Sequence, residues 1–355
     1  MSSFLVDKYK SLAPYTPGEQ PQDKKYIKLN TNESPYPPSQ AALKLAGEEL
    51  EKCRLYPDPD ATRLLDTLAK AYGVGRENVI VTNGSDEVLN FAFMAYCDSN
   101  TPAVFPDITY GFYKVFACIN NLPYSEIPLT QNFEIDIDAY MGTKGTVFIA
   151  NPNAPTGIAL SLSEIERLVA ADRERVVVID EAYVDFGADS AVELTKKYSN
   201  LLVTMTYSKS RSMAGARLGF GIGSREIIED LVKIKYSTNP YNVNRVTAAM
   251  GIGALLDVDY FNENVEKIIT AREYTRAALS ALGFELTPSR ANFLFAKSNK
   301  IGGEELYLTL KERGILVRHF KSERIKVYVR ITVGTLEQMQ ILTKTVEDIL
   351  KEKNK

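Results

Sequence analysis

The sequence predicts an α/β fold in which helices sandwich a mostly parallel central sheet. Short apolar, β-rich runs recur along the middle of the chain without polar alternation, which is typical of strands buried on both faces. Helical patterns separate successive runs, as the crossovers between parallel strands require. With 355 residues, 45% of them hydrophobic, the chain is long enough for a large core shared among two or three domains.

Each element of the expected large domain can be placed from its own pattern. The strands are expected at 79–82, 103–105, 146–150, 176–179 and 201–206. Helical patterns over 86–96, 110–119 and 163–171 follow the first three of these runs. We expect this domain to occupy residues 46–250.

The two ends of the chain differ from this middle part. Helical and strand-like patterns follow one another at 262–282, 293–296, 304–313, 315–318, 327–331 and from Leu336 onward. They predict a smaller α+β domain over residues 251–355. The first 40 residues are rich in Pro and Tyr, so we expect residues 1–45 to form an extended arm.

Composition excludes several classes of function. The net charge of −3 and the scattered Lys and Arg residues favour neither nucleic acid nor a membrane surface as a partner. No signal peptide or apolar run of ~20 residues is evident, and Cys53, Cys97 and Cys118 are spaced like reduced thiols, so we expect a cytoplasmic protein. With His319 as the single histidine, we expect no metal site.

The most informative segment is 204–220, which reads TMTYSKSRSMAGARLGF. A strand-like run ends in hydroxyl residues, and Arg217 follows Lys209 after eight positions. A lysine amine forms an imine with an aldehyde, and the hydroxyls and Arg217 could hold a phosphate beside it. An aldehyde carrying a phosphate describes pyridoxal 5'-phosphate, so the segment predicts this cofactor. A surface lysine after a strand is the ordinary alternative.

Two other segments at strand ends favour a phosphate and a flat ring. In Thr82-Asn-Gly-Ser-Asp-Glu87, Ser85 and Asp86 would stand at a helix start, where free N–H groups attract phosphate. Both residues could equally be plain N-caps. Tyr110 follows the next strand and could stack on a ring, or simply pack half-buried.

Two further segments favour polar contacts to that ring. The rigid turn Asn151-Pro-Asn-Ala-Pro-Thr-Gly157 could aim an asparagine at a ligand. Asp180 would sit at the end of a buried strand, where a carboxylate needs a cation such as a pyridinium nitrogen, and Tyr183 could donate to the ring oxygen. An N-cap is again the alternative for Asp180. Because all five segments end strands of one open sheet, they should meet at one edge, and their agreement carries the prediction.

At this point the chain resembles the fold-type-I pyridoxal phosphate aminotransferases, and within them the histidinol-phosphate aminotransferases. The resemblance covers nearly the whole length and is carried by four motifs: Leu29-Asn-Thr-Asn-Glu-Ser-Pro-Tyr36, Arg54-Leu-Tyr-Pro-Asp58, Asp180-Glu-Ala-Tyr183 and Val329-Arg-Ile-Thr-Val-Gly-Thr335. It implies transamination between histidinol phosphate and 2-oxoglutarate, giving imidazole-acetol phosphate and glutamate in histidine biosynthesis.

The resemblance also implies a role for each matching cofactor residue. Lys209 forms the imine, Asp180 pairs with the pyridine nitrogen and Tyr183 with the ring oxygen, and these three form the catalytic set. Tyr110 stacks on the ring. The phosphate is held by Ser85, Asp86, Thr206, Ser208 and Arg217. Tyr56 reaches the cofactor phosphate of a neighbouring subunit, which implies a homodimer with shared active sites.

On the substrate side, the resemblance implies that Arg330 binds the carboxylate of glutamate or 2-oxoglutarate. Arg318, Tyr15 and Tyr241 match the positions at the phosphate end of the substrate. One position departs from the family pattern, because Ala154 replaces the asparagine that contacts the ring oxygen. We expect either that Asn153 turns inward to replace it, which we favour, or that Tyr183 makes the contact alone.

Other functions remain open on the sequence. The same fold serves aromatic and other amino-acid aminotransferases and phosphothreonine decarboxylase-like lyases, and residues near the substrate do not separate them. A non-catalytic protein that binds pyridoxal phosphate is a further alternative. A P-loop or Rossmann enzyme fits poorly, because neither glycine signature follows the first expected strand.

Overall fold

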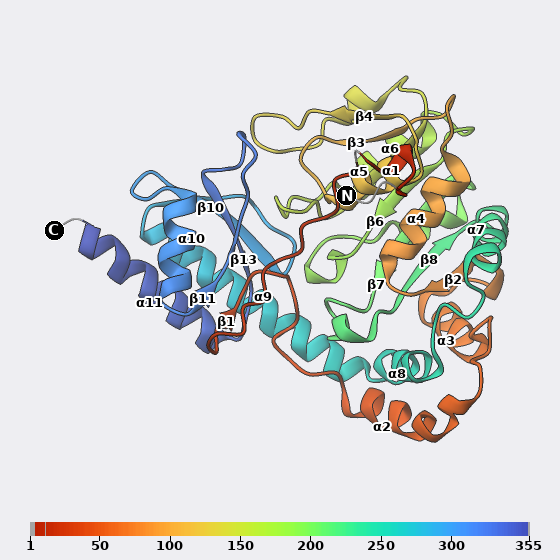
Figure 1. Ribbon diagram of the computed structural model, residues 1–355, viewed down its shortest axis with the longest axis horizontal. Coiled ribbons are helices and arrows are strands. Elements are labelled where there is room, and N and C mark those ends of the chain that lie inside the picture. The colour runs from red at the N-terminus through yellow and green to blue at the C-terminus, as the bar shows by residue number, and fades with distance from the viewer. Residues whose placement is uncertain (1–3, 11, 354–355) are drawn as a thin grey trace.

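A seven-stranded sheet forms the centre of the large part of the molecule (Figure 1). The computed structural model describes residues 4–10 and 12–353. In spatial order the strands are β2 (Val79–Thr82), β8 (Gly219–Gly223), β7 (Leu201–Thr206), β6 (Val177–Asp180), β5 (Thr146–Ala150), β3 (Ala103–Pro106) and β4 (Tyr124–Ile127). Strand β8 pairs antiparallel with both β2 and β7, and the remaining pairs are parallel.

Helices cover both faces of this sheet, since neighbouring residues of a strand point to opposite sides. In β5, Val147 and Ile149 belong to one core cluster, whereas Phe148 and Ala150 belong to another. The first cluster is closed by α3 (Thr62–Tyr72), α6 (Leu162–Ala170) and α8 (Arg245–Leu256), and the second by α4 (Ser85–Tyr96), α5 (Phe112–Ile119) and α7 (Arg225–Thr238). Helix α2 (Gln40–Glu49) packs on α8 at the outside.

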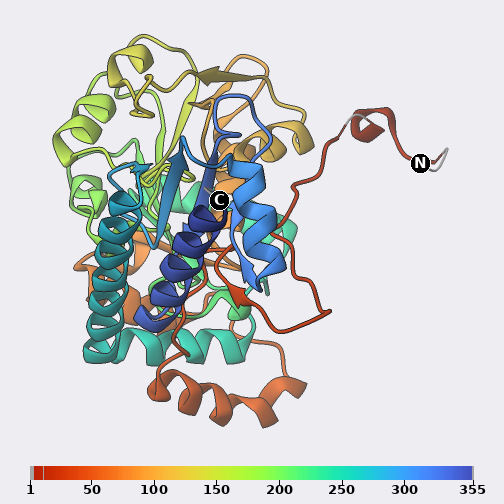
Figure 2. The ribbon, with the colours of Figure 1, turned by 90° about the vertical axis from the view of Figure 1, so that its left-hand side faces the viewer.

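A smaller unit stands beside this sheet and has its own core (Figures 1 and 2). Its antiparallel sheet has the order β12 (Arg318–His319), β13 (Tyr328–Thr332), β10 (Phe293–Ser298) and β9 (Phe284–Leu286). Helices α9 (Val258–Ala281), α10 (Gly303–Glu312) and α11 (Leu336–Lys353) pack against it. The short strand β1 (Ile27–Lys28) pairs in parallel with β11 (Ile315–Leu316) and so ties the N-terminal segment to this unit.

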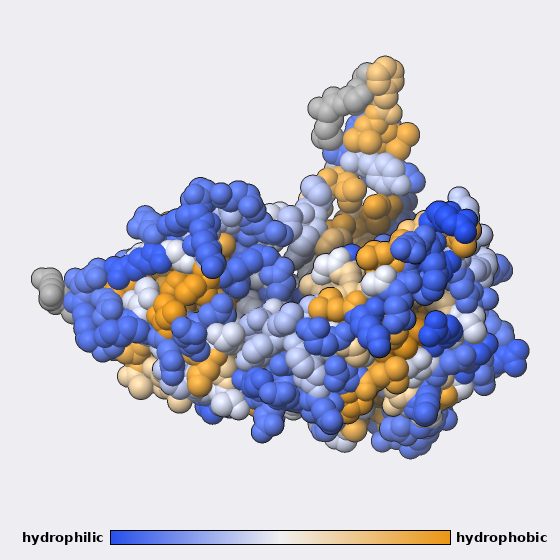
Figure 3. All heavy atoms as spheres, turned by 90° about the horizontal axis from the view of Figure 1, so that it is seen from below, coloured by the Kyte–Doolittle hydropathy of each residue, from blue (hydrophilic) through white to orange (hydrophobic). Residues whose placement is uncertain are grey.

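The remaining elements are short. Helix α1 spans Asp7–Lys10, and single 3₁₀ turns are η1 (Leu50–Arg54), η2 (Arg76–Asn78), η3 (Ile137–Tyr140), η4 (Val184–Phe186), η5 (Ala191–Lys196) and η6 (Ala214–Ala216). The segment around α1 stands away from the body of the molecule (Figures 2 and 3), and Phe4 is 92% exposed. Within the described ranges, every helix is too short or too polar to cross a membrane.

The predicted α/β class and the five expected strands of the large sheet are confirmed. Strands β4 and β8 were not expected. Strand β8 contains glycine at positions 219, 221 and 223, and glycine has a low strand propensity. Strand β4 is an edge strand whose sequence, YSEI, is partly polar. Tertiary pairing, rather than local preference, makes these two segments extend.

The domain limits remain a prediction that needs adjustment. The expected limits at 45 and 250 fall inside α2 and α8, and these two helices pack against each other. Because a helix that packs as one body does not carry a domain boundary, we propose that the arm ends before Gln40 and that the large domain continues to Leu256.

A close contact between β8 and the start of α4 brings the functional edge of the sheet together. A Cβ atom on Gly219 would lie 2.2 Å from the backbone nitrogen of Ser85 and 2.4 Å from the carbonyl carbon of Gly84. Neither backbone atom can move without shifting the helix. Glycine at 219 is therefore needed for α4 to begin where it does.

We expect Gly219→Ala to lower the free energy of unfolding by about 1–3 kcal/mol, since overpacking against backbone forces a shift. Gly215→Ala is the matched control, because a Cβ there meets nothing within 4 Å. That control should change stability by less than about 0.5 kcal/mol. Urea denaturation of both variants measures the difference, and equal stabilities would show that the contact at Gly219 is not restrictive.

Candidate active site

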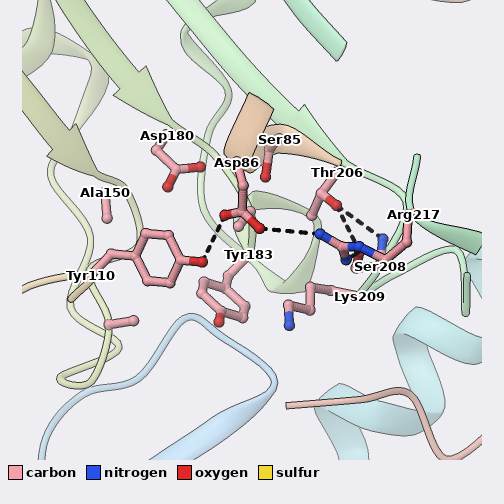
Figure 4. Close-up of a pocket in the computed structure, with 12 residues that line it drawn as sticks. Ser85, Asp86, Tyr110, Ala150, Asp180, Tyr183, Thr206, Ser208, Lys209 and Arg217 are labelled. Carbon is pink, nitrogen blue, oxygen red and sulfur yellow. Dashed lines mark hydrogen bonds and ion pairs between the residues drawn. The ribbon is translucent and has the colours of Figure 1, made fainter. Parts of the chain in front are cut away.

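Five loops meet at the carboxyl edge of the large sheet, as expected for an open α/β sheet (Figure 4). They follow β2, β3, β5, β6 and β7, and together they border a cavity. The cavity is lined by Ser85, Asp86, Tyr110, Ala150, Ala154, Asp180, Ala182, Tyr183, Thr206, Ser208, Lys209 and Arg217. Nine of the eleven residues predicted for the cofactor therefore line one cavity, whereas Asn153 and Tyr56 do not.

Lys209 projects into this cavity from the loop after β7 (Figure 4). Its Nζ lies 5.7 Å from the centre of the Tyr183 ring. Among the described residues, this nitrogen has no hydrogen bond or ion pair. Most exposed lysines of the chain instead pair with a carboxylate, as Lys196 does with Glu193. At the cavity, therefore, no described side chain takes up the lysine amine in a hydrogen bond.

A polar cradle lies next to Lys209. Arg217 Nη2 pairs with Asp86 Oδ2 at 3.1 Å, and Arg217 Nη1 donates to Ser208 Oγ at 3.5 Å. Thr206 Oγ1 donates to Ser208 Oγ at 3.0 Å. Ser85 begins α4, so the free N–H groups of the first turn face the same space. Guanidinium, hydroxyls and a helix N-terminus together form an anion-binding site of the kind that holds phosphate.

The arginine of this cradle depends on two unusual backbone positions. Arg217 itself has a positive φ of 55°, a region that non-glycine residues seldom occupy. Gly84 has φ 80°, and a Cβ atom there would lie 2.6 Å from Arg217 Nη2. The turn before α4 must therefore be glycine for the guanidinium to approach.

Asp180 lies opposite, at the end of β6, and is 4% exposed. Its Oδ2 accepts a hydrogen bond from Tyr113 Oη at 3.1 Å and its Oδ1 accepts one from Thr204 Oγ1 at 3.1 Å. Burial raises the pKa of Asp180 to about 6, the charge of Asp86 adds to the rise, and these hydrogen bonds oppose it. No described cation forms an ion pair with Asp180. The carboxylate is therefore buried and ready for a cationic partner in the cavity.

Tyr110 closes the side of the cavity near Asp86 (Figure 4). Its hydroxyl donates to Asp86 Oδ1 at 2.7 Å, and its ring meets the Tyr113 ring edge-on, with centroids 5.7 Å apart. The ring is therefore fixed from two directions. Such a ring is suited to stacking on a planar ligand.

A second cavity opens beside the first and contains the expected substrate residues Tyr15, Arg318 and Arg330, together with Tyr183 and Lys209. Arg318 and Arg330 are cross-strand partners in β12 and β13. Arg318 donates to the carbonyls of Pro17 and Thr16 at 3.1 and 3.0 Å, and Arg330 Nη2 donates to that of Asn30 at 3.1 Å. Burial lowers the pKa of Arg330, and its Nε has no partner.

Tyr56 and Tyr241 line neither of these two cavities. Their rings stack on each other, with centroids 4.6 Å apart, and they are 78% and 42% exposed. A single chain therefore does not bring these two expected residues to its own site.

The structure turns Asn153 away from the cofactor cavity, against the favoured expectation. Its Nδ2 donates to Ile108 O and Thr156 Oγ1, and its Oδ1 accepts from Thr109 Oγ1. These bonds use the amide to hold the turn together. Ala154 lines the cavity instead and offers only a methyl group.

Sequence reasoning missed two residues that contact the expected catalytic set. Tyr113 donates to Asp180, and Asn32 Nδ2 donates to Tyr183 Oη at 3.0 Å. Tyr113 stands three positions after Tyr110, so the helical pattern expected over 110–119 could have placed both on one side, although α5 begins only at Phe112. Asn32 lies 151 residues from Tyr183 in the chain, and no local pattern points to that contact.

Comparison with known proteins decides the family. Residues 24–346 match the family described as aminotransferase class I and II. The chain belongs to the class I and II aminotransferases. It is 49% identical to a histidinol-phosphate aminotransferase of Brachyspira hyodysenteriae over 353 residues, covering 99% of this chain and 100% of that one. A histidinol-phosphate aminotransferase of Marinomonas sp. is also 49% identical, with 98% and 100% covered.

Solved structures agree on the fold. The histidinol-phosphate aminotransferase of Sinorhizobium meliloti, in complex with pyridoxal 5'-phosphate, superposes with a TM-score of 0.90 and covers 99% of both chains, at 21% identity. The fold is that of a fold-type-I aminotransferase. As a member of this family, the chain is a pyridoxal phosphate-dependent transaminase.

The cavity fits this cofactor on its own chemistry. The buried Asp180 without a cationic partner matches a pyridinium nitrogen, and the cradle around Arg217 matches a phosphate. Lys209 stands between these two ends with an unpaired amine (Figure 4).

The pKa of Asp180 leads to a prediction about stability. Its folded value of about 6 lies above the ~3.9 of an unfolded chain, so the cofactor-free protein loses stability as pH rises from about 4 to above 6. The loss amounts to about 3 kcal/mol at most. Asp180→Asn carries no charge and should be more stable than the unmodified cofactor-free protein by about 1–3 kcal/mol at pH 8, but not at pH 4.

Urea denaturation of the cofactor-free proteins at the two pH values measures this gain. The exposed Asp189→Asn is the matched control and should show no such dependence on pH. A gain for Asp180→Asn that is the same at both pH values would contradict burial of an ionised carboxylate as its cause.

Proposed function

We propose that the protein transfers the amino group of histidinol phosphate to 2-oxoglutarate, as a homodimer and in the cytoplasm. The single observation that carries the proposal is the cavity in which Lys209 stands between a buried carboxylate, Asp180, and an anion cradle, with two arginines in the adjoining space. The curated relatives named above support the substrate. Three free cysteines, Cys53, Cys97 and Cys118, fit a reducing compartment.

When bound, pyridoxal 5'-phosphate supplies an aldehyde that takes up the amino group and a ring that accepts the electrons left by the departing proton. Asp180 would accept a hydrogen bond from the ring nitrogen and keep that nitrogen protonated. Arg217, Ser208, Thr206 and the first turn of α4 would bind the phosphate. Tyr183 would donate to the ring oxygen, and Tyr110 would stack on the ring.

Lys209 is the proton carrier in this proposal. With the cofactor bound, the amine of Lys209 would hold its aldehyde until a substrate amine replaces it. The freed Nζ would then be the base that takes the proton from the α-carbon of the substrate and the acid that gives it back. One amine can serve both carbons because the loop after β7 holds it at the cavity, with no competing partner among the described side chains.

Two arginines would allow one site to bind two substrates with different anionic groups. Histidinol phosphate carries a phosphate and lacks the α-carboxylate of glutamate, yet a guanidinium accepts either anion in the same fork geometry. Arg318 and Arg330 face one another across β12 and β13, so an anion in the second cavity meets both. Tyr15, whose ring stacks on Phe112 with centroids 4.4 Å apart, borders the same space.

Substrate competition tests the proposal. Purified protein loaded with cofactor should transaminate histidinol phosphate with 2-oxoglutarate at a kcat/KM at least about tenfold above that for phenylalanine, since a site that pairs a phosphate disfavours analogues without one. Lys209→Ala should lose multiple turnover and the visible absorbance of the loaded protein. Lys144→Ala, at an exposed position, is the control and should keep both.

A preference for phenylalanine would indicate an aromatic aminotransferase, and decarboxylation of phosphothreonine a lyase. Absorbance without turnover on any of these substrates would indicate a non-catalytic binding protein. Each of these results contradicts the proposed substrate.

The homodimer is supported by exposed apolar side chains around α2 and α8. Leu50, Leu55 and Tyr56 lie on η1 or just after it, and Leu256 ends α8, with exposed fractions of 61%, 51%, 78% and 66%. Figure 3 views the molecule from this side and shows apolar patches among the hydrophilic surface. Such patches mark interaction sites. We infer that a second copy covers them and that Tyr56 and Tyr241 then face the partner's cavity.

Mixing two damaged variants tests the shared site. Lys209→Ala and Tyr56→Phe each impair their own homodimers, but a mixed dimer has one site with both residues intact. Subunit exchange should therefore restore about one quarter of the unmodified sites, because half the dimers are mixed and each has one such site. No recovery, with exchange verified by light scattering of tagged subunits, would show that Tyr56 does not act across the interface.

A further inference from the structure

A buried chain of hydrogen bonds runs from the small sheet to Tyr183. Thr332, at the end of β13, bonds to Asn32, and Asn32 bonds to Tyr183. Asn32 and Thr332 are 1% and 2% exposed. Thr332 lines neither of the two cavities described above, and its hydrogen-bonded connection to Tyr183 passes through Asn32.

The donors and acceptors in this chain allow one direction only. The backbone N–H of Asn32 donates to Thr332 Oγ1 at 2.9 Å, so the single hydroxyl proton of Thr332 points elsewhere. It points to Asn32 Oδ1, at 3.0 Å. That bond marks Oδ1 as the acceptor end of the amide, and the Nδ2 end therefore faces Tyr183 Oη, at 3.0 Å.

The orientation of the Asn32 amide determines where the Tyr183 hydroxyl proton points. Tyr183 Oη already accepts a hydrogen bond from Asn32 Nδ2, so its own hydroxyl proton is left to donate toward the cavity. A reversed amide would place two N–H donors on Thr332 Oγ1 and leave the threonine proton without its partner. One lost hydrogen bond disfavours that arrangement by on the order of tenfold in population.

The backbone of Asn32 is held as firmly as its side chain. Its carbonyl accepts from Asn292 Nδ2 at 3.1 Å, and the N–H of Thr332 donates to Leu29 O at 3.0 Å. Asn32 has a φ of 56°, a left-handed conformation that asparagine tolerates better than most residues. Both the side-chain hydrogen bonds and the backbone conformation therefore favour asparagine at position 32.

We propose that Asn32 is a positioning residue that, with Thr332, directs the Tyr183 hydroxyl proton toward the ring oxygen of the cofactor. The inference rests on the proposed role of Tyr183. It explains how the site works with Ala154 in the turn after β5, where neither Ala154 nor Asn153 presents a donor to the cavity. A correctly directed Tyr183 then supplies the contact to the ring oxygen.

Two variants interrupt the chain at different points. Asn32→Asp keeps the shape and tolerates the left-handed backbone, but replaces the donor by an acceptor that draws the Tyr183 proton away from the cavity. Thr332→Val removes the hydroxyl that orients the amide, and Thr332→Ser is the matched control that keeps it. Tyr183→Phe removes the final donor, and the two double variants with Tyr183→Phe complete the cycles.

Two measurements follow the cofactor rather than turnover. The first is the midpoint pH of the visible absorbance of the loaded protein, and the second is the affinity of the cofactor-free protein for pyridoxal 5'-phosphate. We expect Asn32→Asp and Thr332→Val to move the midpoint in the same direction as Tyr183→Phe and to weaken affinity about 3- to 10-fold, the equivalent of one hydrogen bond. Thr332→Ser should restore both values, and in the Tyr183→Phe background the further changes should disappear.

The outcomes separate the inference from the proposed function. If Tyr183→Phe changes neither value, the role of Tyr183 fails, and the inference fails with it. If Tyr183→Phe changes both values but Asn32→Asp and Thr332→Val change neither, only the inference is overturned. Equal effects in the presence and absence of the Tyr183 hydroxyl would also overturn it, because they would reflect a general loss of structure. Urea denaturation identifies any variant that fails to fold, and the other variant then decides.

Discussion

The site depends on one buried carboxylate at the end of a central strand. Asp180 is enclosed by the sheet and by Tyr113, and no described cation balances its charge. Burying an ionised group costs free energy unless a partner is supplied, and the raised pKa of Asp180 reflects that cost. A pyridinium nitrogen would remove the cost. The buried carboxylate therefore favours binding of a positively charged ring in this cavity.

The other residues of the site lie near Asp180 because the parallel strands of the sheet end at the same edge. Asp180 ends β6, Lys209 and Arg217 lie in the connection between β7 and β8, and Ser85 and Asp86 follow β2. These segments are distant in sequence and meet at one edge of the sheet. The small sheet contributes residues of the substrate space. Strand β13 contains both Arg330 and Thr332. The same strand therefore borders the second cavity and begins the series of hydrogen bonds that leads to Tyr183.

Several residues predicted for the cofactor line the cavity and come from strand ends or a helix start: Asp180 ends β6, Lys209 follows β7 and Ser85 begins α4. Asn153 also follows a strand, β5, but its side chain does not face the cavity. Its neighbours Ile108, Thr109 and Thr156 offered three partners inside the turn, and the amide joined them instead of facing the cavity. Tyr56 and Tyr241 line neither cavity of a single chain, and the proposed second copy is what would bring them to a site.

The sequence by itself determined the α/β class, the strands that carry the chemistry and the cofactor, because buried strands, strand ends and a lysine between hydroxyls and arginine are local patterns. Only the tertiary structure decided that β8 joins the sheet despite its glycines, that Asn153 faces away, and that Asn32 meets Tyr183. The reason is that a hydrogen bond depends on distance and direction in space. For residues that are 151 or 300 positions apart, the order along the chain does not reveal this distance or direction.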